Sequence, residues 1–175
     1  MSRRFKTEAI VLKKKSLPNQ DYILTFLTEK YGMISVFGKG IKKITSRRSP
    51  HIQTGNLIEA IIYKKNNKFY LEETKLISFF SKIKTDPKKI SKLYFLFFVL
   101  ERLLPENQRE EKIYPLAKKF LIDLSERKTS SEIVFNKYLN QIVRDLGYIT
   151  EDRSLDELIN LIQSIINEKI TFFTI

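Results

Sequence analysis

Residues 57–79 read LIEAIIYKKNNKFYLEETKLISF, two runs rich in Ile, Tyr, Phe and Leu that are joined by a pair of asparagines. β-Branched and aromatic residues favour strands, and asparagine tolerates the positive φ angles of a tight turn. We therefore expect a β-hairpin of residues 57–65 and 68–79, with Asn66-Asn67 at the turn. The side chains expected on its apolar face are those of Ile58, Ala60, Ile62, Phe69 and Leu71.

Three further runs of strand-forming residues precede this hairpin. They cover residues 8–14, 21–28 and 33–39, and Tyr31-Gly32 between the last two is typical of a tight turn. Five short strands within about 80 residues indicate a small closed sheet, an OB-like barrel.

The hydrophobic period changes after Asp86-Pro87, from alternation to the 3–4 spacing of an amphipathic helix. The pattern predicts helices at residues 87–104, 110–126, 129–147 and 154–168. The last two begin with the capping-box patterns of Thr129 to Glu132 and Ser154 to Glu157. We therefore expect an α+β fold: a five-stranded OB-fold barrel at residues 1–80, followed by an α-helical domain at residues 81–175 that packs on the barrel.

The charge of the 175-residue chain is strongly positive, with 32 Lys+Arg, 20 Asp+Glu and a formal net charge of +12. Residues 1–80 hold 16 basic and 6 acidic residues, whereas residues 81–175 hold 16 and 14. An excess of positive charge fits a polyanionic partner, such as nucleic acid. Because most of the excess lies in residues 1–80, we expect the partner to bind to that half of the chain.

The residues needed for several kinds of catalytic and metal site are missing. Cysteine is absent and His51 is the single histidine, which excludes a disulfide framework, a thiolate zinc site, a cysteine nucleophile and a multi-histidine metal site. The acidic residues near the predicted strands show no paired spacing that would hold Mg²⁺. We expect a binding protein without metal or cofactor, not an enzyme.

We expect neither a targeting segment nor a membrane-spanning segment. The basic residues Arg3, Arg4 and Lys6 precede only a short apolar run, which argues against a signal peptide. The longest apolar run, residues 93–100, has 8 residues, whereas a membrane-spanning helix needs about 20. A cytoplasmic protein with no membrane partner is expected.

Two basic stretches beside the predicted strands supply cations for phosphate contacts. The candidate DNA-binding cations are Lys13, Lys14, Lys15, Lys39, Lys42, Lys43, Arg47 and Arg48. Phe37 and Tyr63 lie opposite the apolar faces of their strands and are candidates for base stacking. The alternatives are a solvated surface for the cations and packing in the core, or against the helices, for the two rings.

The remaining aromatic residues are expected in cores. Tyr22 and Phe26 belong to a strand with two apolar faces, and a helical block packs the rings of Tyr94, Phe95, Phe97 and Phe98. His51, which follows a proline in a loop, is expected at the surface.

The chain also carries a set of motifs in a defined order. They are residues 7–12 and 21–28, Tyr31-Gly32, Lys39-Gly40 with the basic run after it, Ser46-Arg47, the hairpin of residues 56–63 and 69–72, and the helical landmarks at residues 100–105 and 146–148. In order and spacing these motifs resemble the RecO family of bacterial recombination mediators over nearly the whole chain. Many members carry a four-cysteine zinc module after the last landmark. Here Asp152-Arg-Ser154 continues into the final helix, so the chain resembles a short form without that module.

The resemblance implies an N-terminal OB fold on a helical C-terminal domain that binds single- and double-stranded DNA in DNA repair. It implies annealing of complementary strands and, together with the partner RecR, help in loading the recombinase RecA onto single-stranded DNA. It also implies contact with the C-terminal tail of single-strand-binding protein, and a cytoplasmic, nucleoid-associated location.

Three other classes of function remain open on the residues alone. An OB-fold RNA-binding or ribosome-associated factor would use the same charges and rings, and would prefer structured RNA over single-stranded DNA in competition. An enzyme acting on nucleic acid would show metal-dependent turnover. A protein–protein adaptor would show no salt-dependent binding to DNA.

Overall fold

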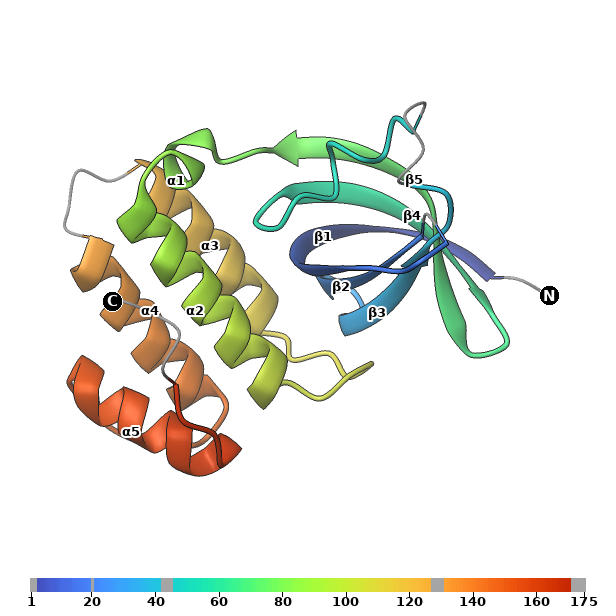
Figure 1. Cartoon of the computed structure of the whole chain (residues 1–175). Coiled ribbons are helices and arrows are strands. Elements are labelled where there is room, and N and C mark those ends of the chain that lie inside the picture. Colours follow the sequence, from blue (N-terminus) through green and yellow to red (C-terminus); the bar gives the residue numbers. More distant parts are fainter. Residues whose placement is uncertain (1–2, 20, 42–45, 127–130, 171–175) are drawn as a thin grey trace. The chain divides into compact units, whose positions relative to one another are not determined.

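The computed structural model describes residues 3–19, 21–41, 46–126 and 131–170. The chain divides into two compact units, which Figure 1 shows as a group of strands and a group of helices. The strand unit contains residues 1–79 together with residues 105–114, and the helical unit contains residues 80–104 and 115–175. The sequence predicted a single boundary after residue 80, whereas the structure returns residues 105–114 to the strand unit.

The strand unit is a closed barrel. Its strands are β1 Arg3–Ser16, β2 Tyr22–Thr28, β3 Gly32–Gly38, β4 Leu57–Lys65 and β5 Lys68–Ser78. They follow one another around the barrel in the order β1-β2-β3-β5-β4. All neighbours are antiparallel except β3 and β5, which are parallel. The α+β prediction, a five-stranded OB-fold barrel followed by helices, is confirmed.

The turns form where the sequence predicts them. Asn66 and Asn67 join β4 to β5 with φ angles of 49° and 57°, and Gly32 has a φ of 69° at the start of β3. Strand β1 pairs with β2 along its second half and with β4 along its first half, which closes the barrel. A bulge between Val11 and Lys13 marks the change.

Along each strand, every second side chain points into the barrel, and these side chains form its core. The buried core residues are Ala9, Val11, Leu24, Phe26, Ile34, Val36, Ile41, Ile52, Ile58, Ala60, Ile62 and Leu71. Tyr22 is partly buried and packs against this core, as does Phe69. The predictions for Tyr22, Phe26 and the inner face of the hairpin are confirmed.

Residues 105–114 lie along the first half of β3, on the side opposite β2, where Met33 bridges Glu106. Among the described residues, β5 pairs only with the second half of β3. The Asn107 N–H donates to the Met33 carbonyl at 2.8 Å, and the Ser35 hydroxyl lies 2.7 Å from the Glu106 carboxylate. The Tyr114 hydroxyl donates to the carboxylate of Glu8 on β1. This segment therefore satisfies part of an otherwise open sheet edge.

The helical unit confirms the predicted helices. Its elements are α1 Ser81–Lys84, α2 Pro87–Leu103, α3 Ile113–Glu126, α4 Ser131–Asp145 and α5 Leu155–Ile166. Pro87 opens α2 behind the N-cap residue Asp86, and the capping box of Ser154 and Glu157 is present. The predicted box beginning at Thr129 lies partly outside the described residues. The short helix α1 was not predicted.

The helical core contains part of the predicted aromatic block. Phe95 and Phe97 are buried, and Phe95 packs edge-on against Phe135 on α4 with a centroid distance of 5.4 Å. The prediction was wrong for Tyr94, which is 47% exposed because it lies on the outer side of α2. Within the described part of the chain, none of the helices has the length and apolarity needed to cross a membrane.

Candidate nucleic-acid interface

Three aromatic side chains stand side by side across the outer surface of the barrel. Phe37 on β3 pairs with Tyr70 on β5, and Tyr70 pairs with Tyr63 on β4. The Tyr63 and Tyr70 rings are stacked, with centroids 5.1 Å apart and planes at 13°. The Phe37 and Tyr70 rings are tilted by 32° with centroids 5.7 Å apart. We call Phe37, Tyr70 and Tyr63 the aromatic row.

The row exists because strand pairing places directly opposed residues on the same face of a sheet. The neighbours of these residues along the chain, Val36, Ile62 and Leu71, point inward and are buried. The rings are partly exposed and do not belong to the barrel core. Of the two alternatives for Phe37 and Tyr63, packing in the barrel core is therefore excluded.

Lysine amines lie close to the rings of this row. The amine of Lys39 is 5.2 Å from the centre of the Tyr70 ring, and the amine of Lys68 is 5.6 Å from the centre of the Phe37 ring. Both lysines are exposed. Each pair is within cation–π distance, so positive charge borders the rings on which bases could stack.

Further basic residues continue the row at both of its ends. Beyond Phe37 the paired residues are Ile23 on β2 and Lys15 on β1. Beyond Tyr63 the paired residue is Arg4, which forms an ion pair with Glu72. Lys15 is exposed. The row therefore runs between two basic residues of β1.

The first predicted basic stretch is divided between two environments. Lys13 and Lys15 are exposed, while the amine of Lys14 donates to the side-chain carbonyl of Gln53 at 2.6 Å. Partial burial lowers the pKa of the Lys14 amine from its ordinary value. Lys14 thus anchors the loop before β4, whereas Lys13 and Lys15 face solvent.

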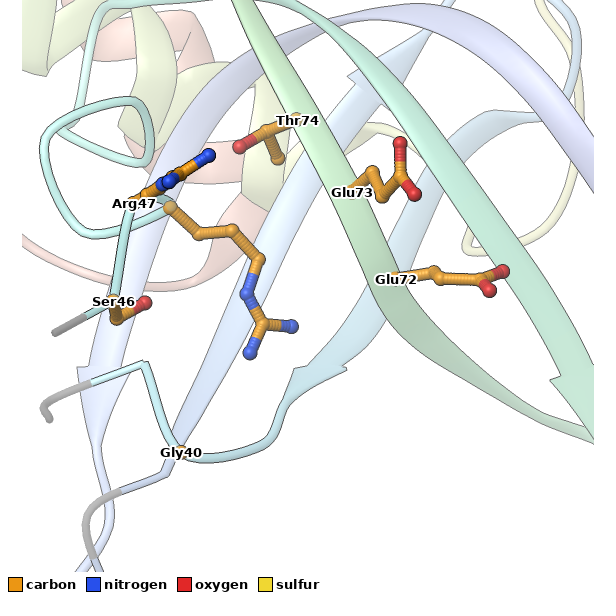
Figure 2. Close-up of a pocket in the computed structure, with 7 residues that line it drawn as sticks. Gly40, Ser46, Arg47, Glu72, Glu73 and Thr74 are labelled. Atoms are coloured by element: carbon orange, nitrogen blue, oxygen red, sulfur yellow. The ribbon is translucent and has the colours of Figure 1, made fainter.

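The second predicted stretch borders an open pocket of about 630 Å³ (Figure 2). Figure 2 shows Ser46 and Arg47 on one wall, and Glu72, Glu73 and Thr74 of β5 on the other. The Arg48 guanidinium donates to the carbonyls of Leu71 at 2.9 Å and Lys39 at 2.8 Å. Because Glu72 and Glu73 line this pocket together with the two arginines, the charge around it is mixed. The predicted site residues Lys42 and Lys43 lie outside the described residues.

Two polar residues have structural partners that the sequence did not reveal. His51 is half-buried and its Nδ1 lies 2.9 Å from the Thr74 hydroxyl, so the prediction of a surface histidine was wrong. Asp21 accepts the Gly40 N–H at 2.7 Å, which holds the end of β3 against the start of β2.

Sequence reasoning missed the residue at the centre of the row. The alternation that places Phe69 and Leu71 inward also places Tyr70 outward, so the signal was present. It also missed Lys68, which follows the Asn66-Asn67 turn directly. The parallel pairing of β3 with β5, which brings Tyr70 between Phe37 and Tyr63, follows from the closed topology and has no local signal.

Comparisons with known proteins identify the family. Residues 1–80 match the family model described as Recombination protein O N terminal. The chain is 30% identical over 149 residues to the DNA repair protein RecO of Thermoanaerobacter sp. (strain X514), an alignment that covers 85% of this chain and 60% of the relative. It is 28% identical over 147 residues to the DNA repair protein RecO of Caldanaerobacter subterraneus subsp. tengcongensis, which covers 84% and 60%. The chain therefore spans about three fifths of the length of these relatives.

Proposed function

Because this chain belongs to the RecO family of recombination proteins, we propose that it is a DNA-binding recombination mediator that acts in DNA repair. It works by binding and not by catalysis. The observation that carries the proposal is the aromatic row with its bordering lysines, because stacked rings beside cations match the chemistry of single-stranded nucleic acid.

Each part of this surface meets a different part of the ligand. Bases stack against the exposed parts of the aromatic row, and stacking on an aromatic side chain contributes about 1–3 kcal/mol per base. Lys39, Lys68 and Lys15 neutralise phosphates, and each contact releases counterions from the strand. Stacking tolerates any base, so the surface binds single strands with little sequence preference.

The family supports a finer proposal. In it, the protein anneals complementary strands and helps to load RecA onto single-stranded DNA together with RecR. It does so on DNA covered by single-strand-binding protein, whose C-terminal tail it contacts. Neutralisation of phosphates on both strands would allow annealing without a nucleotide cofactor.

Binding across a range of salt concentrations tests the proposal. We expect the affinity for a single-stranded DNA oligonucleotide to fall steeply with salt. In the double variant Lys39→Glu/Lys68→Glu, the slope of log K against log salt should be shallower by about 1.4, which is two contacts at about 0.7 each. The control is Lys119→Glu/Lys137→Glu, which makes the same change of charge on exposed residues of the helical unit.

Competition separates this function from the alternative of an RNA-binding factor. Single-stranded DNA should displace a bound DNA oligonucleotide more effectively than structured RNA at the same salt concentration. Preference for the RNA would favour the alternative, and a wild-type protein with no salt-dependent affinity for DNA would reject the proposed function and favour a protein–protein adaptor.

A further inference from the structure

The positive charge of the helical half is concentrated in twelve residues. Residues 81–92 contain five lysines and one acidic residue, Asp86. Residues 93–175 contain 11 basic and 13 acidic residues and are slightly negative. The near-neutral average of the second half therefore hides a segment with a net charge of +4. Residues 81–92 are not part of the aromatic row or of the basic residues beside it.

This segment consists of α1, the two residues that follow it and the start of α2. The N–H groups of Ile83 and Thr85 donate to the carbonyls of Phe80 and Ser81, both at 3.0 Å, and the Asp86 N–H donates to the Ile83 carbonyl at 3.2 Å. The Ile83 side chain is buried and fixes α1. The lysines thus project from a backbone that is already folded, which lowers the entropy lost when a partner binds.

The single acidic residue of the segment, Asp86, uses its carboxylate to cap the N-terminus of α2. The Asp86 Oδ1 accepts the N–H groups of Lys88 at 2.9 Å and Lys89 at 3.3 Å, as an N-cap residue does. Within the described part of the chain, the side chains of Lys82, Lys88 and Lys89 form no ion pair. Elsewhere in the helical unit, Arg102 pairs with Glu168 and Arg144 pairs with Asp152.

We propose that Lys82, Lys88 and Lys89 form a second nucleic-acid surface on the helical unit, which binds the phosphates of a duplex. We call these three residues the helical basic surface. Lys88 and Lys89 follow one another at the first turn of α2, while Lys82 belongs to α1, which packs against α2. Cations on two adjoining helices suit a ligand that presents charge over a broad surface, as a DNA backbone does.

The kind of ligand follows from what surrounds these lysines. Lys82 and Lys88 are exposed and Lys89 is partly exposed, and none of the described aromatic rings lies within cation–π distance of these three amines. Such cations bind phosphates, which a duplex presents as well as a single strand does, so the helical basic surface does not require single strands. The inference rests in part on the proposed function, because a protein with both surfaces holds a single strand on the barrel and a duplex on the helices.

The test compares three variants of the full chain for binding to duplex and to single-stranded DNA. Lys82→Glu/Lys88→Glu/Lys89→Glu should weaken duplex binding by about tenfold or more and reduce its salt slope by about 2 to 3. Affinity for a short single-stranded oligonucleotide should change by no more than about twofold, a difference that corresponds to less than one phosphate contact. The charge-matched control is Lys119→Glu/Lys137→Glu/Lys169→Glu, which changes exposed lysines elsewhere in the helical unit.

A gain of affinity provides a check that misfolding cannot imitate. Asp86→Asn keeps the helix cap, because Asn and Asp cap equally well, but removes the negative charge from the segment. We expect it to bind duplex more tightly than wild type, with single-strand affinity unchanged. Duplex affinities that are equal in the Lys82/Lys88/Lys89 variant and its control would overturn the inference, as would an Asp86→Asn protein no tighter than wild type.

Two other outcomes have a defined meaning. If the Lys82/Lys88/Lys89 variant loses binding to polyglutamate but keeps its duplex affinity, the surface serves an acidic protein and the inference is wrong. If wild type binds duplex through these lysines but fails to bind single strands, the inference stands and the proposed function of the barrel fails.

Discussion

Tyr70 is the residue on which the barrel surface depends. It lies between Phe37 and Tyr63 and contacts both rings, with centroids 5.7 Å and 5.1 Å away. The amine of Lys39 also lies near its ring. Loss of this ring would separate the two remaining aromatic residues and interrupt the surface against which bases stack.

Tyr70→Ala should therefore weaken binding to single-stranded DNA by about 1–3 kcal/mol, the contribution of one stacked base. Tyr70→Phe keeps the ring and should bind within about twofold of wild type, since stacking uses the π-face and not the hydroxyl. Fluorescence anisotropy with a labelled oligonucleotide measures both. Tyr148→Ala, which removes an exposed tyrosine from the helical unit, is the control. Equal losses in Tyr70→Ala and Tyr148→Ala would remove Tyr70 from the site.

Gly32 is required for two independent reasons. Its φ of 69° lies in the left-handed region, and a Cβ there would approach the Gln108 carbonyl oxygen to 1.9 Å. Gly32→Ala should lower the free energy of unfolding by at least about 1–3 kcal/mol, the cost of a strained backbone position, with the displacement of residues 105–114 in addition. Urea denaturation measures this, and an unchanged midpoint would show that the segment does not pack on β3 as described.

At the scale of elements, the contact between Tyr114 and Glu8 ties residues 105–114 to β1. Burial raises the pKa of the Tyr114 hydroxyl well above its ordinary range, and the hydrogen bond to Glu8 and the charges of Glu8 and Glu29 raise it further. The protonated hydroxyl is thus favoured in the folded state. Its contribution to stability is complete below about pH 10, the unfolded pKa, and is lost as the pH rises above that value.

Tyr114→Phe should consequently be less stable than wild type at neutral pH, by about 1.5–3 kcal/mol for a hydrogen bond to a charged group. The difference between the two proteins should shrink as the pH rises above about 10, because wild type alone loses this contribution. Thermal unfolding from pH 8 to 11 follows the change. A difference that stays constant over this range would contradict the assigned hydrogen bond.

The elements show what a sequence can and cannot reveal. The five strands and four long helices were predictable because alternation and 3–4 spacing are local signals, and Pro87 and the Ser154 capping box mark their helices unambiguously. The return of residues 105–114 to the barrel was not predictable, because its contacts with Gly32, Met33 and Ser35 depend on the folded shape of β3. The helix α1 has four residues, too few for a periodic signal.

The candidate site was predictable only in part, for a related reason. A sequence gives the number of cations but not their partners. Lys14 and Arg48 count equally with Lys13 and Lys15 in the sequence, yet the structure shows that Gln53 holds the first and two backbone carbonyls hold the second. The stacking residues Phe37 and Tyr63 were identified from alternation, but their alignment through Tyr70 requires strand pairing.

Over the whole molecule, two contributions to DNA binding differ in their dependence on salt. The aromatic row adds affinity that salt affects little, because ring–base stacking releases no counterions. The lysines around it add affinity that falls with salt. Ring variants should therefore lower the affinity at every salt concentration. Lysine variants should instead change the slope of log K against log salt.

The most direct measurement is the salt dependence of single-stranded DNA binding by Phe37→Ala/Tyr63→Ala/Tyr70→Ala, beside the Lys39→Glu/Lys68→Glu variant. We expect the ring variant to lose affinity by about 10²-fold or more, from two or more lost stacking contacts. Its salt slope should remain that of wild type, while the lysine variant has the shallower slope. Wild-type affinity in a folded ring variant would contradict the claim that single strands bind along this face of the barrel.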